Sequence, residues 1–314
     1  MQGVRVRSRH RRWVEGEARM RLLCCISSIL VGTAMGMIAA AGNGLAQPAP
    51  SPSDYKMFAL EPEGSALVIG GRSAIIADWP ATLVFRFEEM ENGQRVPKGC
   101  TATMVGPRAI LVAAHCLPPS PNARVEVRDQ ASGSTRMVAL VCETHPDWHP
   151  VRGQDSDYGL CLPSEPLSRP RGGFEMLDHE TSALDTGSTL LLLGYGCTVA
   201  GGSTDFRRIY LGEAEITHMP FDLLLLGENR FIKTRGGPVL CSGDSGGAAY
   251  RLLDPGRVDR RRRVVGVNAR SDRVSESFIS ATGVVGFRNW AISWAQRNAV
   301  TICGIEGSLN DCRQ

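Results

Sequence analysis

Three side chains in this sequence could together carry out acyl transfer from a serine nucleophile. Ser245 lies in the glycine-rich stretch 243–247, His115 follows an apolar run, and Asp157 precedes Tyr158. A serine hydroxyl is a weak nucleophile, so it needs an imidazole to take its proton and a carboxylate to orient that imidazole. The chain order His, Asp, Ser is one of the known orders of such a triad.

The same stretch could also supply the groups that stabilise the negative charge formed during acyl transfer. We expect the backbone N–H groups of Gly243 and Ser245 to form an oxyanion hole. Each motif alone has a structural alternative, because Gly-Asp-Ser-Gly-Gly is commonly a turn and a histidine after an apolar run can be a core residue. Their occurrence together, in this order, favours the catalytic interpretation.

The N-terminal residues have the pattern of a secretory signal peptide. Residues 1–21 contain seven arginines and two glutamates, whereas residues 22–46 carry no charge and end in small residues suited to cleavage. Met20 is an alternative start. An uncleaved membrane anchor is the alternative reading, because the apolar block from Leu22 to Ala41 approaches the ~20 residues that span a bilayer. Residues 47–67, rich in Pro, Ser and Glu, are expected to be a flexible pro-segment.

The charge of the chain gives no support to nucleic-acid binding. The formal net charge is +3, and residues 1–21 contribute +5, so the remainder carries −2. We interpret the run Arg260–Arg263 as a charged turn between strands.

Ten cysteines are present, and Cys24 and Cys25 fall within the proposed signal. The other eight suit an oxidising compartment, and eight cysteines allow 105 pairings. No CxxC spacing supports a metal site, so we expect no metal and no cofactor.

The mature region is predicted to be all-β. Short apolar runs alternate with turn residues, as in Thr82–Phe87, Ala109–Ala114, Arg124–Arg128, Met137–Cys142, Thr189–Leu193 and Val264–Val267. The apolar run Phe221–Leu226 is expected to be a buried strand, with a surface patch as the alternative. Only Asn289–Asn298 has a clear helical pattern.

Several further motifs resemble the trypsin/chymotrypsin-like serine protease family. Besides the stretches around His115, Asp157 and Ser245, they are Val68-Ile69-Gly70-Gly71, Trp79-Pro80, Gly99-Cys100-Thr101-Ala102-Thr103, Gly194-Tyr195-Gly196 and the pair Phe287 and Trp290. The resemblance implies two six-stranded antiparallel β-barrels with a C-terminal helix. The protease domain would span 68–298, with the two barrels joined near 162–171, followed by a tail over 299–314.

The resemblance also assigns roles to individual residues. Asp157 fits the family's acid–apolar–small–apolar pattern better than Asp155, which is the alternative acid. Asp244 is expected to receive the freed amino group of Val68 in an ion pair that shapes the oxyanion hole. The residue before Val68 is Leu67 rather than a basic residue, so self-cleavage after Leu67 is the hypothesis for activation.

Four disulfides are expected. The resemblance selects Cys100–Cys116, which closes the histidine loop. The family usually pairs the cysteine at 241 with one downstream of the serine, but no cysteine lies between Cys241 and Cys303. We therefore predict Cys197–Cys241, together with Cys142–Cys161 and Cys303–Cys312.

Two departures from the family concern the substrate. Val239, six residues before Ser245, is expected at the base of the specificity pocket, followed by Leu240, with Ile279 on the far wall. An apolar base would leave a buried substrate cation without a partner, so apolar or small residues are predicted before the scissile bond. Ala269 stands where the family usually has a serine that supports the acid.

The sequence therefore predicts a secreted or periplasmic serine endopeptidase. Its partners are expected to be protein or peptide substrates, with no nucleic acid, membrane contact only if the leader is retained, and a monomeric state. A catalytically silent, protease-like binding or regulatory protein of the cell envelope is the alternative.

Overall fold

The computed structural model describes residues 69–117, 123–128, 134–149, 156–178, 184–220, 231–253, 262–305 and 312. The predicted signal over 1–46, the pro-segment over 47–67, Val68 and the run Phe221–Leu226 lie outside the described residues. Within the described part, no helix combines the length and apolar character needed to cross a bilayer.

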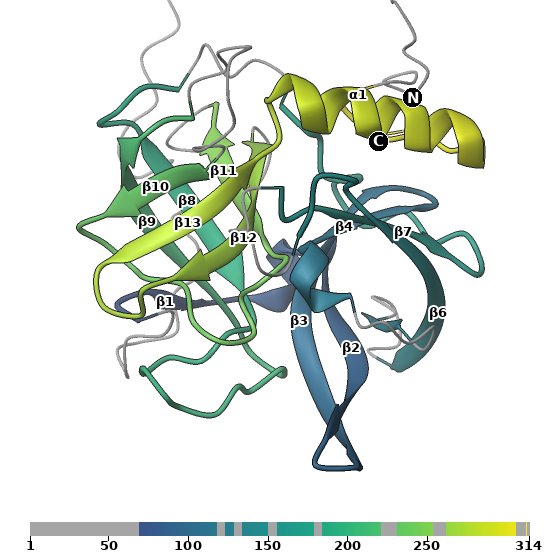
Figure 1. The fold of residues 1–314 in the computed structure, drawn as a ribbon, viewed down its shortest axis with the longest axis horizontal. Coiled ribbons are helices and arrows are strands. Elements are labelled where there is room, and N and C mark those ends of the chain that lie inside the picture. Colours follow the sequence, from purple (N-terminus) through teal and green to yellow (C-terminus); the bar gives the residue numbers. More distant parts are fainter. Residues whose placement is uncertain are drawn as a thin grey trace, which may run out of the picture. The chain divides into compact units, whose positions relative to one another are not determined.

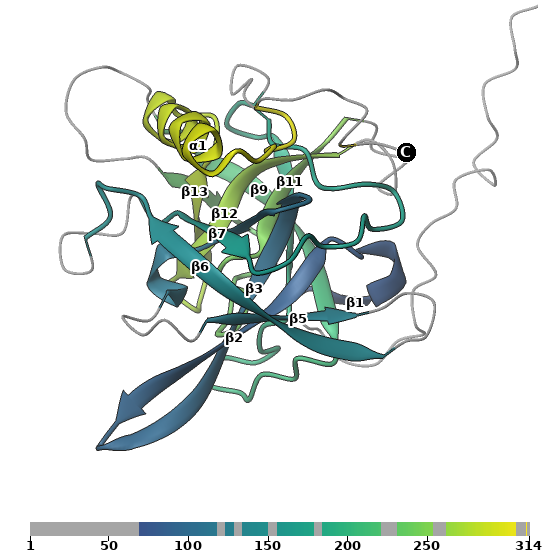
Figure 2. The same cartoon turned by 90° about the vertical axis from the view of Figure 1, so that its right-hand side faces the viewer.

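The first half of the described chain forms a closed antiparallel barrel (Figure 1). In ring order its six strands are β2 (Thr82–Glu91), β3 (Gln94–Gly106), β4 (Ala109–Val112), β7 (Gly159–Pro163), β6 (Thr135–Thr144) and β5 (Arg124–Arg128). Strands β2 and β3 continue beyond the barrel as a two-stranded hairpin that turns at Asn92 and Gly93 (Figure 2). Both turn residues have positive φ, as tight hairpin turns require.

The second half forms a ringed antiparallel sheet. Its order is β1 (Arg72–Ala74), β9 (Ile209–His218), β10 (Phe231–Arg235), β13 (Glu276–Ala281), β12 (Arg262–Ser271), β11 (Ala248–Leu252) and β8 (Thr189–Gly194). Because β8 also pairs with β9, six of these strands close on themselves and β1 is an added edge. Helix α1 (Val285–Asn298) follows the last strand. The predicted fold class, two six-stranded antiparallel barrels with a C-terminal helix, is confirmed.

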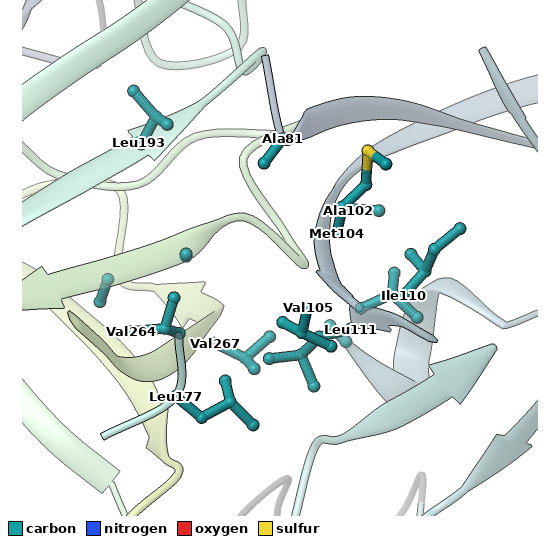
Figure 3. Close-up of a cluster of buried hydrophobic side chains, with 14 of the residues drawn as sticks. Ala81, Ala102, Met104, Val105, Ile110, Leu111, Leu177, Leu193, Val264 and Val267 are labelled. Atoms are coloured by element: carbon teal, nitrogen blue, oxygen red, sulfur yellow. The ribbon is translucent and has the colours of Figure 1, made fainter. Parts of the chain in front are cut away.

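The two sheets share one apolar core. Figure 3 shows Val105 and Leu111 of the barrel near Val267 of β12 and Leu177, and all four are essentially inaccessible to solvent. Buried apolar side chains from both sheets belong to this single cluster. The sheets are therefore held together by shared hydrophobic packing as well as by the connecting chain.

Helix α1 is longer than the sequence pattern suggested, since it begins at Val285 rather than near Asn289. The first turn contains Val285 and Gly286, which are weak helix formers, so propensity alone does not mark it. Tertiary packing stabilises this turn instead, because the ring of Phe287 lies 4.6 Å from the ring of Tyr158. The hydroxyl of Tyr158 donates to the carbonyl of Ala281 on β13 at 2.6 Å.

The run Arg260–Arg263 is not simply a charged turn. Arg260 and Arg261 lie outside the described residues, but Arg262 begins β12 and is largely buried. Its guanidinium pairs with the carboxylate of Glu175 and lies 3.9 Å from the ring centroid of Trp79. The sequence interpretation was wrong for Arg262, because a buried carboxylate and an aromatic face provide the partners that let an arginine leave water.

The segment after the predicted join is attached to the C-terminal tail. Leu177 donates its N–H to the carbonyl of Cys303 at 2.8 Å, and Cys303 donates to the carbonyl of Val105 on β3 at 2.7 Å. Phe174 donates to the carbonyl of Cys312 at 3.2 Å. The described tail residues Cys303 and Cys312 are therefore bonded into the fold.

Candidate active site

His115 and Asp157 meet at the end of a strand pair. Strands β4 and β7 are paired, with Val112 opposite Gly159, so the residues just beyond that pair face each other. His115 lies in the short 3-10 helix η3 (Ala114–Cys116) after β4, and Asp157 lies just before β7. The ring Nδ1 of His115 is 2.7 Å from Oδ2 of Asp157. The backbone N–H of His115 also donates to Oδ1 at 2.8 Å.

These two contacts with Asp157 determine which ring nitrogen of His115 carries the proton. Asp157 is fully buried, whereas the side chain of His115 remains 30 % exposed. An ionised carboxylate only accepts hydrogen bonds, so it places the proton of a neutral ring on Nδ1. Nε2 is then left with a lone pair that can take a proton.

Ser245 lies in the turn before β11, where the loop touches the strands that carry the histidine. Its carbonyl accepts the N–H of Thr101 on β3 at 2.8 Å. A Cβ at the next residue, Gly246, would lie 2.2 Å from the carbonyl oxygen of Thr101 and 3.0 Å from the backbone nitrogen of Ala113. Only glycine permits this approach, which places the Ser245 loop beside the segment leading to His115.

No hydrogen bond joins the Ser245 hydroxyl to His115 in the described part of the structure. Nε2 of His115 is instead 3.7 Å from Sγ of Cys116. Hydrogen bonds between a nucleophile and its base are often long or poorly aligned in substrate-free catalytic sites and tighten when substrate binds.

Two backbone N–H groups in the loop that carries Ser245 bear on the expected oxyanion hole, those of Gly243 and Ser245. The carbonyl of Ser242 accepts from Cys197 N–H and from Thr204 Oγ1, each at 2.9 Å. This orients the following amide so that the N–H of Gly243 points the opposite way. Among the described residues, no acceptor takes the N–H of Gly243 or of Ser245. Both N–H groups are therefore available to a bound acceptor, as an oxyanion hole requires.

Asp244 forms the buried base of this loop. Its Oδ1 accepts the N–H of Gly196 at 2.7 Å and its Oδ2 accepts the N–H of Cys241 at 2.8 Å. A Cβ at Gly196 would lie 2.2 Å from the carboxyl carbon, so glycine is required there. Burial raises the pKa of Asp244 to about 7, although the two backbone hydrogen bonds lower it. No described cation pairs with it, and Val68 lies outside the described residues.

Ile69 lies beside Val239, a residue of the candidate pocket. The carbonyl of Ile69 accepts the N–H of Val239 at 3.0 Å. The backbone at Ile69 is therefore antiparallel to the segment that contains Val239 and leads into the loop that carries Ser245.

Four disulfides join the pairs that the sequence analysis expected. They are Cys100–Cys116, Cys142–Cys161, Cys197–Cys241 and Cys303–Cys312. The bond Cys197–Cys241 flanks both hydrogen-bond donors to Asp244, since Gly196 and Cys241 are the residues that donate. It therefore ties the loop after β8 to the loop that carries Ser245.

The candidate pocket residues Val239, Leu240 and Ile279 are all buried. The N–H of Leu240 donates to Oγ of Ser277 at 3.0 Å, and its carbonyl accepts from Oγ of Ser271 at 2.5 Å. Sequence reasoning did not select these two serines. No motif marks them, because a lone serine in a strand can face either side of the sheet.

Two other positions were selected from the sequence, Ala269 and Asp155. Ala269 is buried and lies where the pairing of β12 with β13 shifts register. It offers no hydroxyl to Asp157, so the described partner of that carboxylate is His115 alone. The alternative acid, Asp155, lies outside the described residues.

One described cluster has metal-ligand side chains, namely Cys100, His115 and Cys116. Both sulfurs belong to the disulfide Cys100–Cys116, so neither can act as a thiolate ligand. The arrangement around His115 suits proton transfer better than metal binding.

Comparison with known proteins gives one family. A model of the family described as Trypsin matches residues 68–291, which is most of the chain. No curated protein matches the sequence.

The Cys197–Cys241 bond should contribute substantially to stability. It closes a separation of 44 residues, against 9 for Cys303–Cys312. From loop-closure entropy, the Cys197→Ser/Cys241→Ser variant should lose about 4 kcal/mol of unfolding free energy in urea, and the Cys303→Ser/Cys312→Ser control about 2.6 kcal/mol. A smaller loss for the first variant than for the control would contradict this ordering.

Asp244 should make stability depend on pH in the chain that retains residues before Val68. Its folded pKa of about 7 lies above its unfolded value of 3.8. The folded state therefore holds more protons between these values, so the unfolding free energy should fall as pH rises from about 4 to about 7, by up to about 4 kcal/mol.

Urea unfolding across this pH range would measure the effect in a Ser245→Ala background, which blocks self-processing. Asp244→Asn should remove this part of the slope. Asp178→Asn, which changes a buried aspartate paired with Arg251, should keep it. If the slope of the unfolding free energy against pH is unchanged in Asp244→Asn, the assignment of this pH dependence to Asp244 is refuted.

Proposed function

Because this chain belongs to the trypsin family, we propose that it is a secreted serine endopeptidase. The observation that carries the proposal is the buried Asp157 carboxylate, 2.7 Å from Nδ1 of a partly exposed His115. The loop that carries Ser245 docks against the same part of the barrel through Thr101. This arrangement supports proton transfer at a nucleophilic serine.

In the proposed first half-reaction, Oγ of Ser245 attacks the carbonyl carbon of the scissile peptide bond. Nε2 of His115 takes the hydroxyl proton, and Asp157 stays ionised and stabilises the imidazolium. The carbonyl oxygen becomes an oxyanion that accepts from the N–H groups of Gly243 and Ser245. His115 then gives its proton to the departing amine, the C–N bond breaks, and an ester to Ser245 remains.

In the second half-reaction a water molecule replaces the amine. His115 removes a proton from water as its oxygen attacks the ester carbonyl, and the same backbone donors stabilise the second oxyanion. The ester C–O bond breaks, the proton returns to Oγ of Ser245, and the product leaves with a new carboxyl group.

For activation, we propose that cleavage after Leu67 frees the amino group of Val68. A cation beside the buried Asp244 would lower the pKa of its carboxyl group and offset the cost of its burial. The antiparallel contact between Ile69 and Val239 supports an approach of the chain from this side. Because Leu67 is apolar, the enzyme itself is the proposed activator.

We further propose a secreted or periplasmic, monomeric enzyme with the signal, pro-segment and domain limits expected from the sequence. Four disulfides are consistent with an oxidising compartment. Protein or peptide chains are the proposed substrates, as family membership implies.

The alternative is a protease-like binding protein without turnover. Ala269 favours it, because a buried alanine gives Asp157 no additional hydroxyl donor. The three groups that perform the proton transfer remain, so the enzyme is the preferred function.

Labelling with a fluorophosphonate distinguishes these two functions, since only an activated serine reacts. The mature protein should be labelled at Ser245 and should hydrolyse peptides, whereas Ser245→Ala should do neither. Asp157→Asn should lower kcat by about 10⁴-fold because the ring loses its orienting carboxylate. Asp155→Asn is the matched control and should retain activity; loss of turnover only in Asp155→Asn would reassign the acid.

Profiling with a peptide library should show cleavage after apolar or small residues. The buried side chains of Val239 and Leu240 offer no partner to a cation, so peptides with Lys or Arg before the scissile bond should react at least about 100-fold more slowly in kcat/KM. Val239→Asp should reduce this difference in kcat/KM between the two kinds of peptide. Wild-type preference for Lys or Arg would disprove the assignment of this pocket.

A further inference from the structure

Strand β12 has an open edge beside the candidate nucleophile. Asn268 donates its N–H to the carbonyl of Gly247 and accepts from Gly246 at its own carbonyl, both at 2.8 Å. Strand β11 begins at Ala248, which pairs with Val267, so it does not run alongside residues 269–271. In the part of the chain that the structure describes, Arg270 and Ser271 have a strand partner only on the β13 side, and Ala269 lies at the register shift between the two strands.

An open strand edge can bind an extended peptide as an added strand. Here the edge begins next to the loop that carries Ser245. A peptide bound along it would place the carbonyl group of its scissile bond near the hydroxyl of Ser245. It continues to Ser271, whose hydroxyl contacts the carbonyl of Leu240 in the candidate pocket. The residues of a substrate that precede the scissile bond would therefore lie along residues 269–271.

The middle residue of this edge is Arg270, whose side chain is exposed. Its guanidinium carbon lies 4.8 Å from the ring centroid of Phe278 on β13 and 5.1 Å from that of Phe231 on β10. The two rings are themselves in edge contact, with centroids 6.0 Å apart. Stacking on aromatic faces restrains the guanidinium while leaving its N–H groups available for an anion.

A second cationic side chain lies over the ring of Phe278. The Nζ of Lys233 lies 5.7 Å from the same Phe278 ring. Within the described residues, no carboxylate pairs with Arg270, although other exposed arginines on this sheet do have such partners. Glu276, the acidic residue on β13, pairs with Arg235. An incoming carboxylate would thus meet an oriented guanidinium with unused donors.

We propose that Arg270 is a specificity-determining residue that binds an acidic side chain of the substrate, two to four residues before the scissile bond. The proposal rests on the proposed function, because it requires a substrate to lie along this edge of β12. A guanidinium and a carboxylate can form two parallel hydrogen bonds, which selects an acidic side chain over its amide.

Matched peptides with Glu, Gln or Lys at each of these three positions test the proposal by kcat/KM. At one position the wild type should prefer Glu over Gln by about fivefold, the upper range for an exposed ion pair. The preference should appear mainly in KM and should weaken as salt is added. Arg270→Gln should abolish it, and Arg270→Lys should restore part of it.

Arg273→Gln is the matched control, because Arg273 is an exposed arginine three residues further along the chain. It should leave the Glu preference intact. If Arg273→Gln removes the preference as fully as Arg270→Gln does, the effect is one of general charge and the proposal is wrong. An equal Glu-to-Gln ratio in the wild type and Arg270→Gln also overturns it.

Binding measurements separate this proposal from the proposed function. Fluorescence anisotropy of the same labelled peptides on Ser245→Ala requires no turnover. Tighter binding of the Glu peptide to Ser245→Ala than to Ser245→Ala/Arg270→Gln supports the role of Arg270, even if the wild type hydrolyses nothing. Equal binding to the two variants overturns that role, whereas a wild type without turnover or fluorophosphonate labelling contradicts the proposed protease function instead.

Discussion

The buried side chain of Thr101 joins the barrel to the loop that carries Ser245. Its backbone N–H donates to the carbonyl of Ser245 at 2.8 Å, and its hydroxyl donates to the carbonyl of Gly243 at 2.7 Å while accepting the N–H of Tyr195 at 2.9 Å. One fully buried threonine thus satisfies three polar backbone groups in the second half of the chain. The positions of Ser245 and of the backbone N–H of Gly243 relative to His115 depend on these contacts.

The two aspartates of the site show how the same side chain acquires different properties. Asp157 and Asp244 are both fully buried, and each accepts two hydrogen bonds. Asp157 faces an imidazole that can become a cation, whereas Asp244 receives only neutral backbone N–H groups. Burial therefore dominates at Asp244 and raises its pKa. A neighbouring group that can carry positive charge offsets the cost of burying an ionised carboxylate.

Short-range signals explain which features could be predicted from the sequence. Glycines in the Ser245 loop and the apolar run before His115 mark local geometry that only a few residue types permit, and short apolar runs between turn residues indicated an all-β fold. The two barrels followed from the family resemblance. Short-range signals could not predict three features: the first turn of α1, the burial of Arg262 and the contact of Ser277 with the candidate pocket. Each depends on a partner distant in sequence, respectively Tyr158, Glu175 and Leu240. The open edge of β12 likewise depends on where β11 begins.

The contacts of the tail also constrain the order in which the molecule can be completed. Cys303 donates to Val105 in the barrel and accepts from Leu177, so residues from widely separated parts of the chain meet at one point. A chain that is synthesised from its N-terminus cannot make these hydrogen bonds until Cys303 has emerged. The barrel can assemble its own strands earlier, but the junction that Cys303 forms closes late. Completion of the fold is thereby coupled to completion of synthesis.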